Sequence, residues 1–140
     1  MKTVSATTWI DAQPLKVWAI LTDLSRYQEW NPFFVAAAGE IAVGRRIFLR
    51  CLPPGGRPMT IKPTVTAATT GAELRWTASV PGIIGGEHSF TLSAGNGGTL
   101  LVQSETFKGL LVPVSGRALA RAETGFQALN SALKARAEAL

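Results

Sequence analysis

The sequence predicts an α+β domain in which a curved antiparallel sheet of about seven strands wraps around one long C-terminal helix, with two short helices after the first strand. Between residues 33 and 107, β-rich runs alternate with glycine and proline turns, which is typical of antiparallel strands. After Gly109 the apolar residues recur at steps of three and four, which indicates an amphipathic helix. That helix has to bury its apolar face against the apolar face of the sheet. A strongly curved sheet would leave space between the two.

The N-terminal part predicts one strand and two short helices. Residues 2–10 are rich in β-branched side chains and favour a strand. A helix is expected to begin at Pro14, because proline suits the first helical position. Its apolar face is expected to hold Leu15, Trp18, Ile20 and Leu21. Ser25 and Gln28 fit a capping box that would start the second helix, and Pro32 would end it.

The middle of the chain predicts the remaining strands, separated by turns at Gly44, at residues 53–56 and at Gly71. Pro63 predicts an edge position or a bulge for its strand, because proline cannot donate a hydrogen bond to a neighbouring strand. Cys51 is expected to be a small core residue rather than a nucleophile.

The C-terminal segment, residues 112–140, predicts a long helix with one apolar stripe. The stripe consists of Leu119, Ala122, Phe126, Leu129, Leu133, Ala137 and Leu140. Gly125 interrupts it and weakens the helix by about 1 kcal/mol relative to alanine. We expect this glycine either to let a bulky neighbour approach the helix or to permit a bend.

Composition restricts the class of protein. With 140 residues the chain is expected to form a single domain spanning residues 1–140. It is 46% hydrophobic and 16% charged, so apolar side chains are available to line a cavity as well as to fill a core. The single cysteine excludes an internal disulfide and a thiolate zinc cluster. No run resembles a signal peptide or a membrane span, so we expect a cytoplasmic protein without integral membrane association.

The net charge of +5 comes from lysines and arginines scattered along the chain, which is typical of a solvated surface. Nucleic-acid binding would need a basic stripe interleaved with aromatic residues, so no nucleic-acid partner is expected. No metal or other cofactor is expected, and the oligomeric state, monomer or homodimer, remains open.

Residues 86–107 predict a β-hairpin whose tip is the glycine-rich segment 95–98, and they include the only histidine of the chain. This tip sets three opposed pairs: Ala94 with Thr99, His88 with Glu105, and Phe90 with Gln103. Side chains alternate between the faces of a strand, so all four residues of the last two pairs share one face. We expect that face to point inward, among aromatic side chains.

The His88–Glu105 pair has three open interpretations. The two side chains can satisfy each other and fix the register of the sheet, since a buried carboxylate without a partner is costly. They can orient a polar group of a ligand in an apolar pocket. They can also act as a general acid and base, although no other part of a catalytic set is evident in the sequence.

A series of N-terminal residues matches a known signature: Pro14, Val17-Trp18, Asp23, Tyr27 and Trp30-Asn31-Pro32. In this spacing the chain resembles the SRPBCC superfamily, the START-like and Bet v 1-like helix-grip proteins that include the bacterial polyketide cyclase/dehydrase group. The segments "GEHSF" and "SETFKGLL" and the C-terminal helix fit the same pattern in order, so the resemblance covers essentially the whole chain. It is specific for the fold and weak for the function, because this fold hosts many activities.

The resemblance implies a deep, mostly apolar cavity between the sheet and the long helix, where known members bind lipids, sterols, hormones or aromatic polyketides. Carried over to this chain, its wall would contain Trp76, His88, Phe90, Glu105, Phe107, Phe126, Leu129 and Leu133. Its mouth would contain Trp30, Phe33, Phe34, Ile83-Ile84 and Leu110-Leu111. Trp30 could equally be a packing anchor for its short helix, and Trp76 a core residue.

We therefore expect the protein to bind a small hydrophobic or amphipathic ligand, lipid-like or aromatic, oriented by His88, Glu105 and Gln103. One alternative is a metal-free cyclase or dehydratase, a lyase or isomerase, in which His88 is the acid or base and Glu105 orients its imidazole. A second alternative is a protein-interaction module that uses exposed apolar residues at positions 83–84 and 110–112.

Overall fold

The computed structural model describes residues 1–80, 84–109 and 116–139, and it confirms the α+β helix-grip fold. The chain begins with β1 (Lys2–Ile10), α1 (Pro14–Thr22), the 3₁₀ turn η1 (Leu24–Arg26) and α2 (Tyr27–Trp30). The strands that follow are β2 (Phe34–Ala38), β3 (Phe48–Cys51), β4 (Met59–Ile61), β5 (Thr64–Thr69), β6 (Glu73–Val80), β7 (Ile84–Gly95) and β8 (Gly98–Lys108). The long helix α3 (Gly116–Glu138) comes last.

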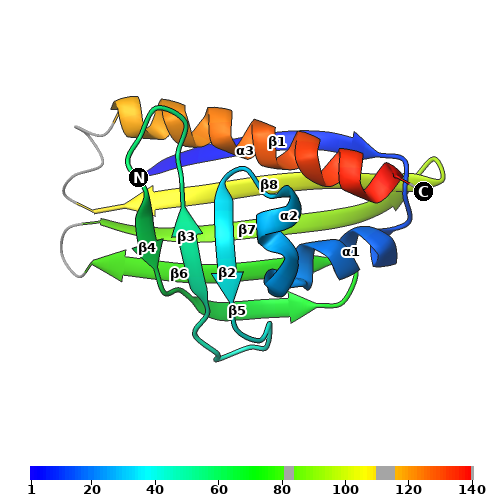
Figure 1. The fold of residues 1–140 in the computed structure, drawn as a ribbon, viewed down its shortest axis with the longest axis horizontal. Coiled ribbons are helices and arrows are strands. Elements are labelled where there is room, and N and C mark those ends of the chain that lie inside the picture. Colours follow the sequence, from blue (N-terminus) through cyan, green and yellow to red (C-terminus); the bar gives the residue numbers. More distant parts are fainter. Residues whose placement is uncertain (81–83, 110–115, 140) are drawn as a thin grey trace.

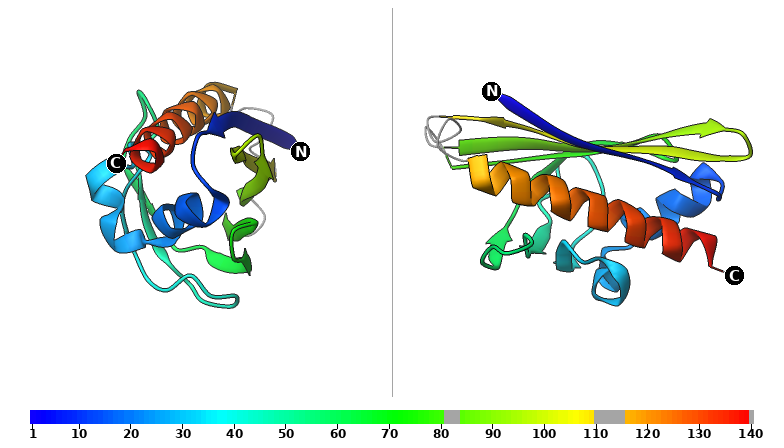
Figure 2. Two further views of the ribbon diagram at one scale, coloured as in Figure 1. Left: turned by 90° about the vertical axis from the view of Figure 1, so that its right-hand side faces the viewer. Right: turned by 90° about the horizontal axis from the view of Figure 1, so that it is seen from above.

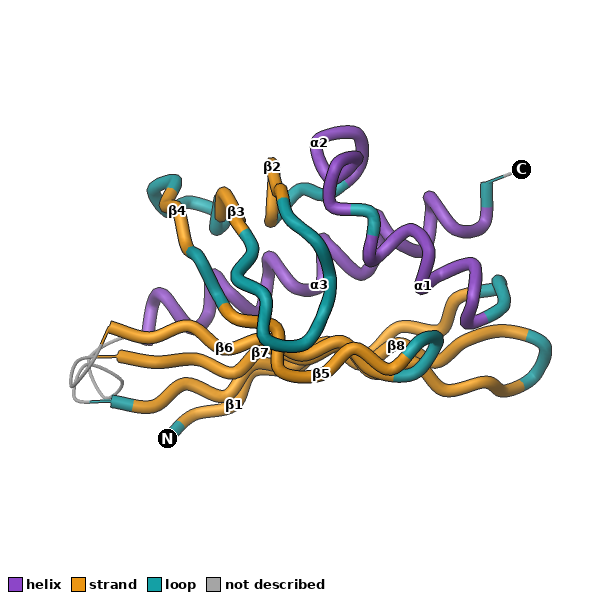
Figure 3. The backbone as a smooth tube through the Cα atoms, turned by 90° about the horizontal axis from the view of Figure 1, so that it is seen from below, coloured by secondary structure: helices purple, strands orange, loops and turns teal. Residues whose placement is uncertain are grey.

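The described strands form two antiparallel sheets, one of five strands in the order β1-β8-β7-β6-β5 and one of three in the order β2-β3-β4. Figure 1 shows the smaller sheet crossing in front of the larger one, with α3 running along the β1 edge. Seen from above and below, all three helices and the smaller sheet lie on the same side of the five-stranded sheet (Figures 2 and 3). The interior therefore has the large sheet as one wall, and α3 and the small sheet as the others.

Pro63 accounts for the division into two sheets. The run around it, expected as a single strand, is interrupted there and continues as β4 in the small sheet and β5 in the large one. Each of these strands lies at the edge of its sheet, as expected for a strand next to proline, and the β5–β6 pairing shifts register between Val65 and Ala67.

The predicted register of the β7–β8 hairpin is confirmed: Ala94 pairs with Thr99, and His88 pairs with Glu105. The turn is tighter than the expected four-residue tip, because Gly95 and Gly98 also pair. The two residues left in the turn, Asn96 and Gly97, have φ angles of 50° and 77°. Positive values at both positions are typical of a type I′ turn, which matches the twist of the strands and leaves the register unchanged.

Helix α1 begins at Pro14 as predicted, but its buried face differs from the expected one. Val17 and Leu21 are fully buried, whereas Leu15 is 65% exposed. Trp18 and Ile20 are only partly buried against the core. The helix therefore packs mainly through residues four apart, and Leu15 lies on the outer side.

The capping box expected at Ser25 and Gln28 is wrong. Ser25 lies inside η1, and its hydroxyl donates to Asp23 Oδ1 at 2.6 Å, so α2 begins only at Tyr27. The signature residues around it have structural roles of their own. The buried Tyr27 hydroxyl donates to the Leu21 carbonyl at 2.5 Å, and Asn31 Oδ1 accepts the backbone N–H groups of residues 33 and 34 at 3.0 and 2.8 Å.

Helix α3 buries the predicted stripe from Ala122 to Ala137, and Leu140 lies outside the described residues. Gly125 is a site of close approach, because a Cβ atom there would overlap the ring of Phe33. Asn130 is fully buried in the same stripe and was not predicted. Among the described helices, α3 included, none is long and apolar enough to cross a membrane.

Candidate functional site

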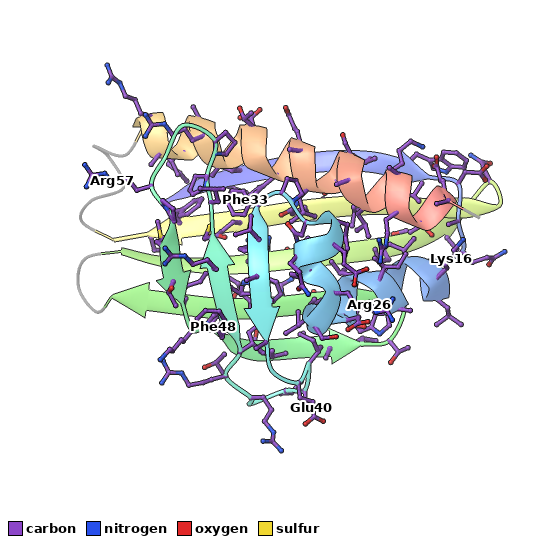
Figure 4. The ribbon with its side chains drawn as sticks, viewed as in Figure 1. Lys16, Arg26, Phe33, Glu40, Phe48 and Arg57 are labelled. Atoms are coloured by element: carbon purple, nitrogen blue, oxygen red, sulfur yellow. The ribbon has the colours of Figure 1, made fainter. Side chains whose placement is uncertain are left out.

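A cavity of about 970 Å³ lies between the small sheet, the β6–β8 part of the large sheet and the first half of α3. Its walls are largely apolar and aromatic. The large apolar side chains come from the start of β2, from β6 and β8, and from α3: Phe33, Phe34, Trp76, Phe107, Leu119 and Phe126. Figure 4 shows Phe33 next to α3, where it comes from the loop that precedes β2. The first half of the helix faces this space. Its second half packs directly on the sheet through the buried residues Leu129, Leu133 and Ala137.

His88 lies in the wall of the cavity and is only 1% exposed. Its imidazole stacks on Trp76, with ring centroids 5.2 Å apart and planes inclined by 15°. The rings of Phe90 and Phe126 each lie 4.9 Å away from it. The only histidine of the chain is therefore enclosed by aromatic rings, and its polar atoms depend on neighbouring side chains for hydrogen bonds.

A chain of hydrogen bonds connects this imidazole to the long helix. His88 Nδ1 lies 2.5 Å from Glu105 Oε1, and His88 Nε2 lies 3.0 Å from Gln103 Oε1. The amide nitrogen of Gln103 donates to Asn130 Oδ1 at 2.8 Å and to the Phe126 carbonyl at 3.2 Å. The amide nitrogen of Asn130 donates in turn to the Ala6 carbonyl at 3.0 Å. We call this series of four side chains, Glu105, His88, Gln103 and Asn130, the polar relay.

The relay determines where the protons lie. Because the Gln103 amide nitrogen already donates to two acceptors, its oxygen faces His88 and accepts, so Nε2 must carry a hydrogen. The close contact between Nδ1 and Glu105 then holds one further proton. The pair is either an imidazolium with a carboxylate or a neutral imidazole with a carboxylic acid, and its net charge is zero in both arrangements.

Glu105 is the member of the pair that presents polar atoms to the cavity. Its side chain is 20% exposed, against 2% for His88, and both ring nitrogens of His88 are occupied by protein partners. The free oxygen, Oε2, lies against Gly86, another residue of the cavity wall, where an added Cβ would overlap it. In this geometry Glu105 faces the cavity, and His88 lies behind it, between Glu105 and Gln103.

Seven of the residues predicted to form the wall or mouth of the cavity lie in its lining: Phe33, Phe34, Trp76, His88, Glu105, Phe107 and Phe126. The others in the described ranges lie elsewhere. Phe90, Leu129 and Leu133 are fully buried outside the cavity lining, and Gln103 is fully buried behind His88. Trp30 packs edge-on against Tyr27 and is not part of the cavity lining. Leu111 and the loop residues 83 and 110–112 lie outside the described residues.

The cavity also has walls that were not predicted. They come from the segment between β3 and β5, which contributes Pro53, Gly56, Arg57, Pro58, Met59, Thr60, Ile61 and Lys62. In the sequence this segment shows only a proline- and glycine-rich break, which indicates a turn and says nothing about what the turn covers. Folding places it opposite α3, so it completes the side of the cavity that faces away from the large sheet.

Cys51 also lines the cavity, next to the polar relay. Burial, with a smaller contribution from the charge of Glu105, raises the pKa of its thiol to about 12. The thiol is therefore protonated at neutral pH and is a poor nucleophile. In the described part of the chain, no three His, Cys, Asp or Glu side chains converge in a way that could hold a metal ion. The relay is thus the acid–base group that this wall offers.

Comparison with known proteins agrees with this architecture. The family model for "Polyketide cyclase / dehydrase and lipid transport" matches residues 1–138. The solved structure of protein MLL2253 from Mesorhizobium loti is similar, with a TM-score of 0.80 and 23% identity over 99% of this chain and 100% of that chain. A START superfamily protein from Mycobacterium smegmatis is similar with a TM-score of 0.77 and 19% identity, over 97% of each chain.

The di-domain ARO/CYC BexL from the BE-7585A biosynthetic pathway has a TM-score of 0.77 and 15% identity, over 99% of this chain and 50% of its own. No curated protein matches the sequence significantly. At these levels of identity the solved structures establish the fold and leave the ligand open.

We predict that Gly86→Ala displaces the Glu105 carboxylate, because the new Cβ would overlap Oε2 sterically. Loss of its hydrogen bond to the buried His88 should lower the free energy of unfolding by about 1–3 kcal/mol. Gly95→Ala, on the same strand with open space around its Cβ, is the matched control and should change stability by less than about 1 kcal/mol. Urea unfolding measures both, and equal stabilities for the two variants would contradict the placement of Glu105.

Proposed function

The chain belongs to the polyketide cyclase/dehydrase and lipid transport family, and from this premise we propose that it binds a small hydrophobic or amphipathic molecule in the cavity beside the polar relay. The observation that carries the proposal is a space of about 970 Å³, lined largely by apolar and aromatic side chains, with the hydrogen-bonded His88–Glu105 pair in its wall. Sites for small organic ligands have this character: a concave apolar lining with a few placed polar groups, in a space of roughly 300–1,000 Å³.

The aromatic wall supplies the affinity. Each Å² of apolar surface removed from water contributes about 25 cal/mol, so a ligand that buries roughly 300 Å² gains about 7 kcal/mol before the costs of association. The rings of Phe33, Trp76 and Phe126 line this space and contact one another or their neighbours edge-on, which restricts their movement. A pocket held in this way loses little entropy when a ligand enters.

Glu105 supplies the orientation. Its free oxygen, Oε2, accepts a hydrogen bond in either proton arrangement, because the shared proton lies on the side of Oε1. The pair therefore favours a ligand that places a hydroxyl or another hydrogen-bond donor at this point of the wall. This narrows the expectation from the sequence, which left the polar group of the ligand unspecified.

A second function is favoured by the same pair: proton transfer in a cyclisation or dehydration. In the imidazolium–carboxylate arrangement, Glu105 can take a proton from an acidic C–H or a hydroxyl of a bound molecule, while His88 stays as its counter-ion. The similarity to an ARO/CYC protein is in keeping with this chemistry and does not establish it. Binding is common to both functions, so it is the first property to test.

We expect Ala122→Phe to weaken binding of the neutral fluorescent probe N-phenyl-1-naphthylamine at least tenfold, because the new ring fills space that the ligand would occupy. Ala122 is buried on the face of α3 that lines the cavity. Ala128→Phe, on the exposed face of the same helix, is the matched control and should bind as the wild type does. Fluorescence titration measures both. Unchanged binding by Ala122→Phe, or no binding by the wild type, would contradict the proposed site.

For the second function, Glu105→Gln should lower the rate of cyclisation of a poly-β-ketone thioester mimic by about 10²–10⁴-fold, because the amide cannot accept the proton. Binding of the mimic should persist. Glu123→Gln, on the exposed face of α3, is the control and should keep the wild-type rate. If the wild type binds the mimic and accelerates no reaction, the protein is a binding protein only.

A further inference from the structure

The cavity wall carries four basic side chains in addition to its apolar residues: Arg46, Arg57, Lys62 and Arg121. All four are exposed, so they lie where the cavity meets solvent. Within the described lining, Glu105 is the only acidic residue, and the proton that it shares with His88 makes that pair neutral overall. The opening therefore has an excess of positive charge. We call these four residues the basic rim.

The residues of the basic rim form two groups, one on each side of β4: Arg57 with Arg121, and Arg46 with Lys62. Arg121 extends from α3 to the connection between β3 and β4. Its Nε lies 3.6 Å from the point where a Cβ atom on Gly55 would be, and Gly55 is two residues before Arg57. On the other side, Arg46 Nε donates to the Lys62 carbonyl at 3.4 Å. Figure 4 shows Arg57 at the end of the molecule where α3 begins, Lys16 at the opposite end, and Arg26 beside α2.

None of the four rim side chains has an acidic partner within 4.0 Å among the residues that the structure describes, which is also true of Lys2, Lys16, Arg50, Lys108 and Arg117. The other five basic residues do have one: for example, Arg26 lies 3.6 Å from Asp23, and Arg45 lies 4.0 Å from Glu40. Lys134 and Arg136 are likewise paired with Glu138 and Glu29 at 2.5 Å. Uncompensated charges of one sign around a low-dielectric cleft attract ligands of the opposite sign.

We propose that the ligand of this cavity is an amphipathic anion, whose carboxylate or phosphate group is held at the basic rim while its apolar body lies among the aromatic side chains. The proposal rests on the proposed binding function and adds the chemical class of the ligand. Arginine is well suited to this role, because its guanidinium binds carboxylate and phosphate through two parallel hydrogen bonds. A hydroxyl on the apolar body would reach Glu105, so the ligand would have one polar contact at the rim and a second one in the cavity wall.

Three probes of equal chain length test the class: decanoate, decyl phosphate and decan-1-ol, titrated by calorimetry below the concentrations at which they form micelles. The two anions should bind about tenfold more tightly than the alcohol, and this advantage should decrease as salt is added, because the rim is exposed. A preference for one anion over the other identifies the acid group. Inorganic phosphate alone should bind at least tenfold more weakly than decyl phosphate, and equal binding would overturn the role of the apolar body.

The double variant Arg57→Gln/Arg121→Gln should weaken the binding of both anions about tenfold and that of decanol much less. Lys16→Gln/Arg26→Gln removes the same net charge at two residues outside the cavity lining and should leave all three affinities near the wild-type values. Thermal unfolding of each variant verifies that it is folded.

The proposal is overturned if decanol binds as tightly as the anions, or if both double variants weaken anion binding equally. In either case, binding of decanol that is lost in Ala122→Phe would show that the cavity binds ligands without selecting an acid. Failure of all three probes to bind the wild type would instead count against the proposed function itself.

Discussion

The side-chain amide of Gln103 is the constraint on which the rest of the site depends. Its nitrogen donates to Asn130 and to the Phe126 carbonyl, so its orientation is fixed by the helix, and its oxygen faces the imidazole. His88 then has a hydrogen on Nε2, and Nδ1 is left to share a proton with Glu105. Four polar side chains satisfy one another in an apolar interior, where each unpaired group would cost about 1–3 kcal/mol. The relay is therefore stable only as a complete set.

The hydrogen bonds of Gln103 to Phe126 and Asn130 also mark the point at which the long helix changes its surroundings. Around Asn130 the helix packs directly on the sheet and buries the relay, and Leu129 and Leu133 fill the remaining space. Before Phe126 it faces the small sheet across the cavity, with Phe33 packed against Gly125. The closed half thus holds the polar groups in position, and the open half borders the cavity. Under the proposed function, the apolar walls, the Glu105 carboxylate and the basic rim together determine which ligands the cavity would bind.

Much of this could be predicted from the sequence, because the signals are local. The turn glycines and the alternation of side chains fixed the hairpin register, and with it the His88–Glu105 contact. Asn130 could not be identified in this way, since it meets Gln103 only when α3 docks, 27 residues away along the chain. The basic rim was equally hidden: residues 46, 57, 62 and 121 look like a scattered solvated surface until folding brings them to one opening. Local patterns determine register and faces, whereas the contents of a cavity depend on how distant segments pack.

The protonation of His88 is the most direct test of this account, because it depends on the orientation of Gln103 and on nothing at the surface. Nitrogen NMR of the ¹⁵N-labelled protein at neutral pH distinguishes protonated from unprotonated ring nitrogens of the single histidine. The account predicts that Nε2 carries a hydrogen in the wild type and that Gln103→Leu, which removes its acceptor, alters the signals of both ring nitrogens. An unprotonated Nε2 in the wild type would show that the relay is absent, and that the imidazole rather than Glu105 is the polar group offered to the ligand.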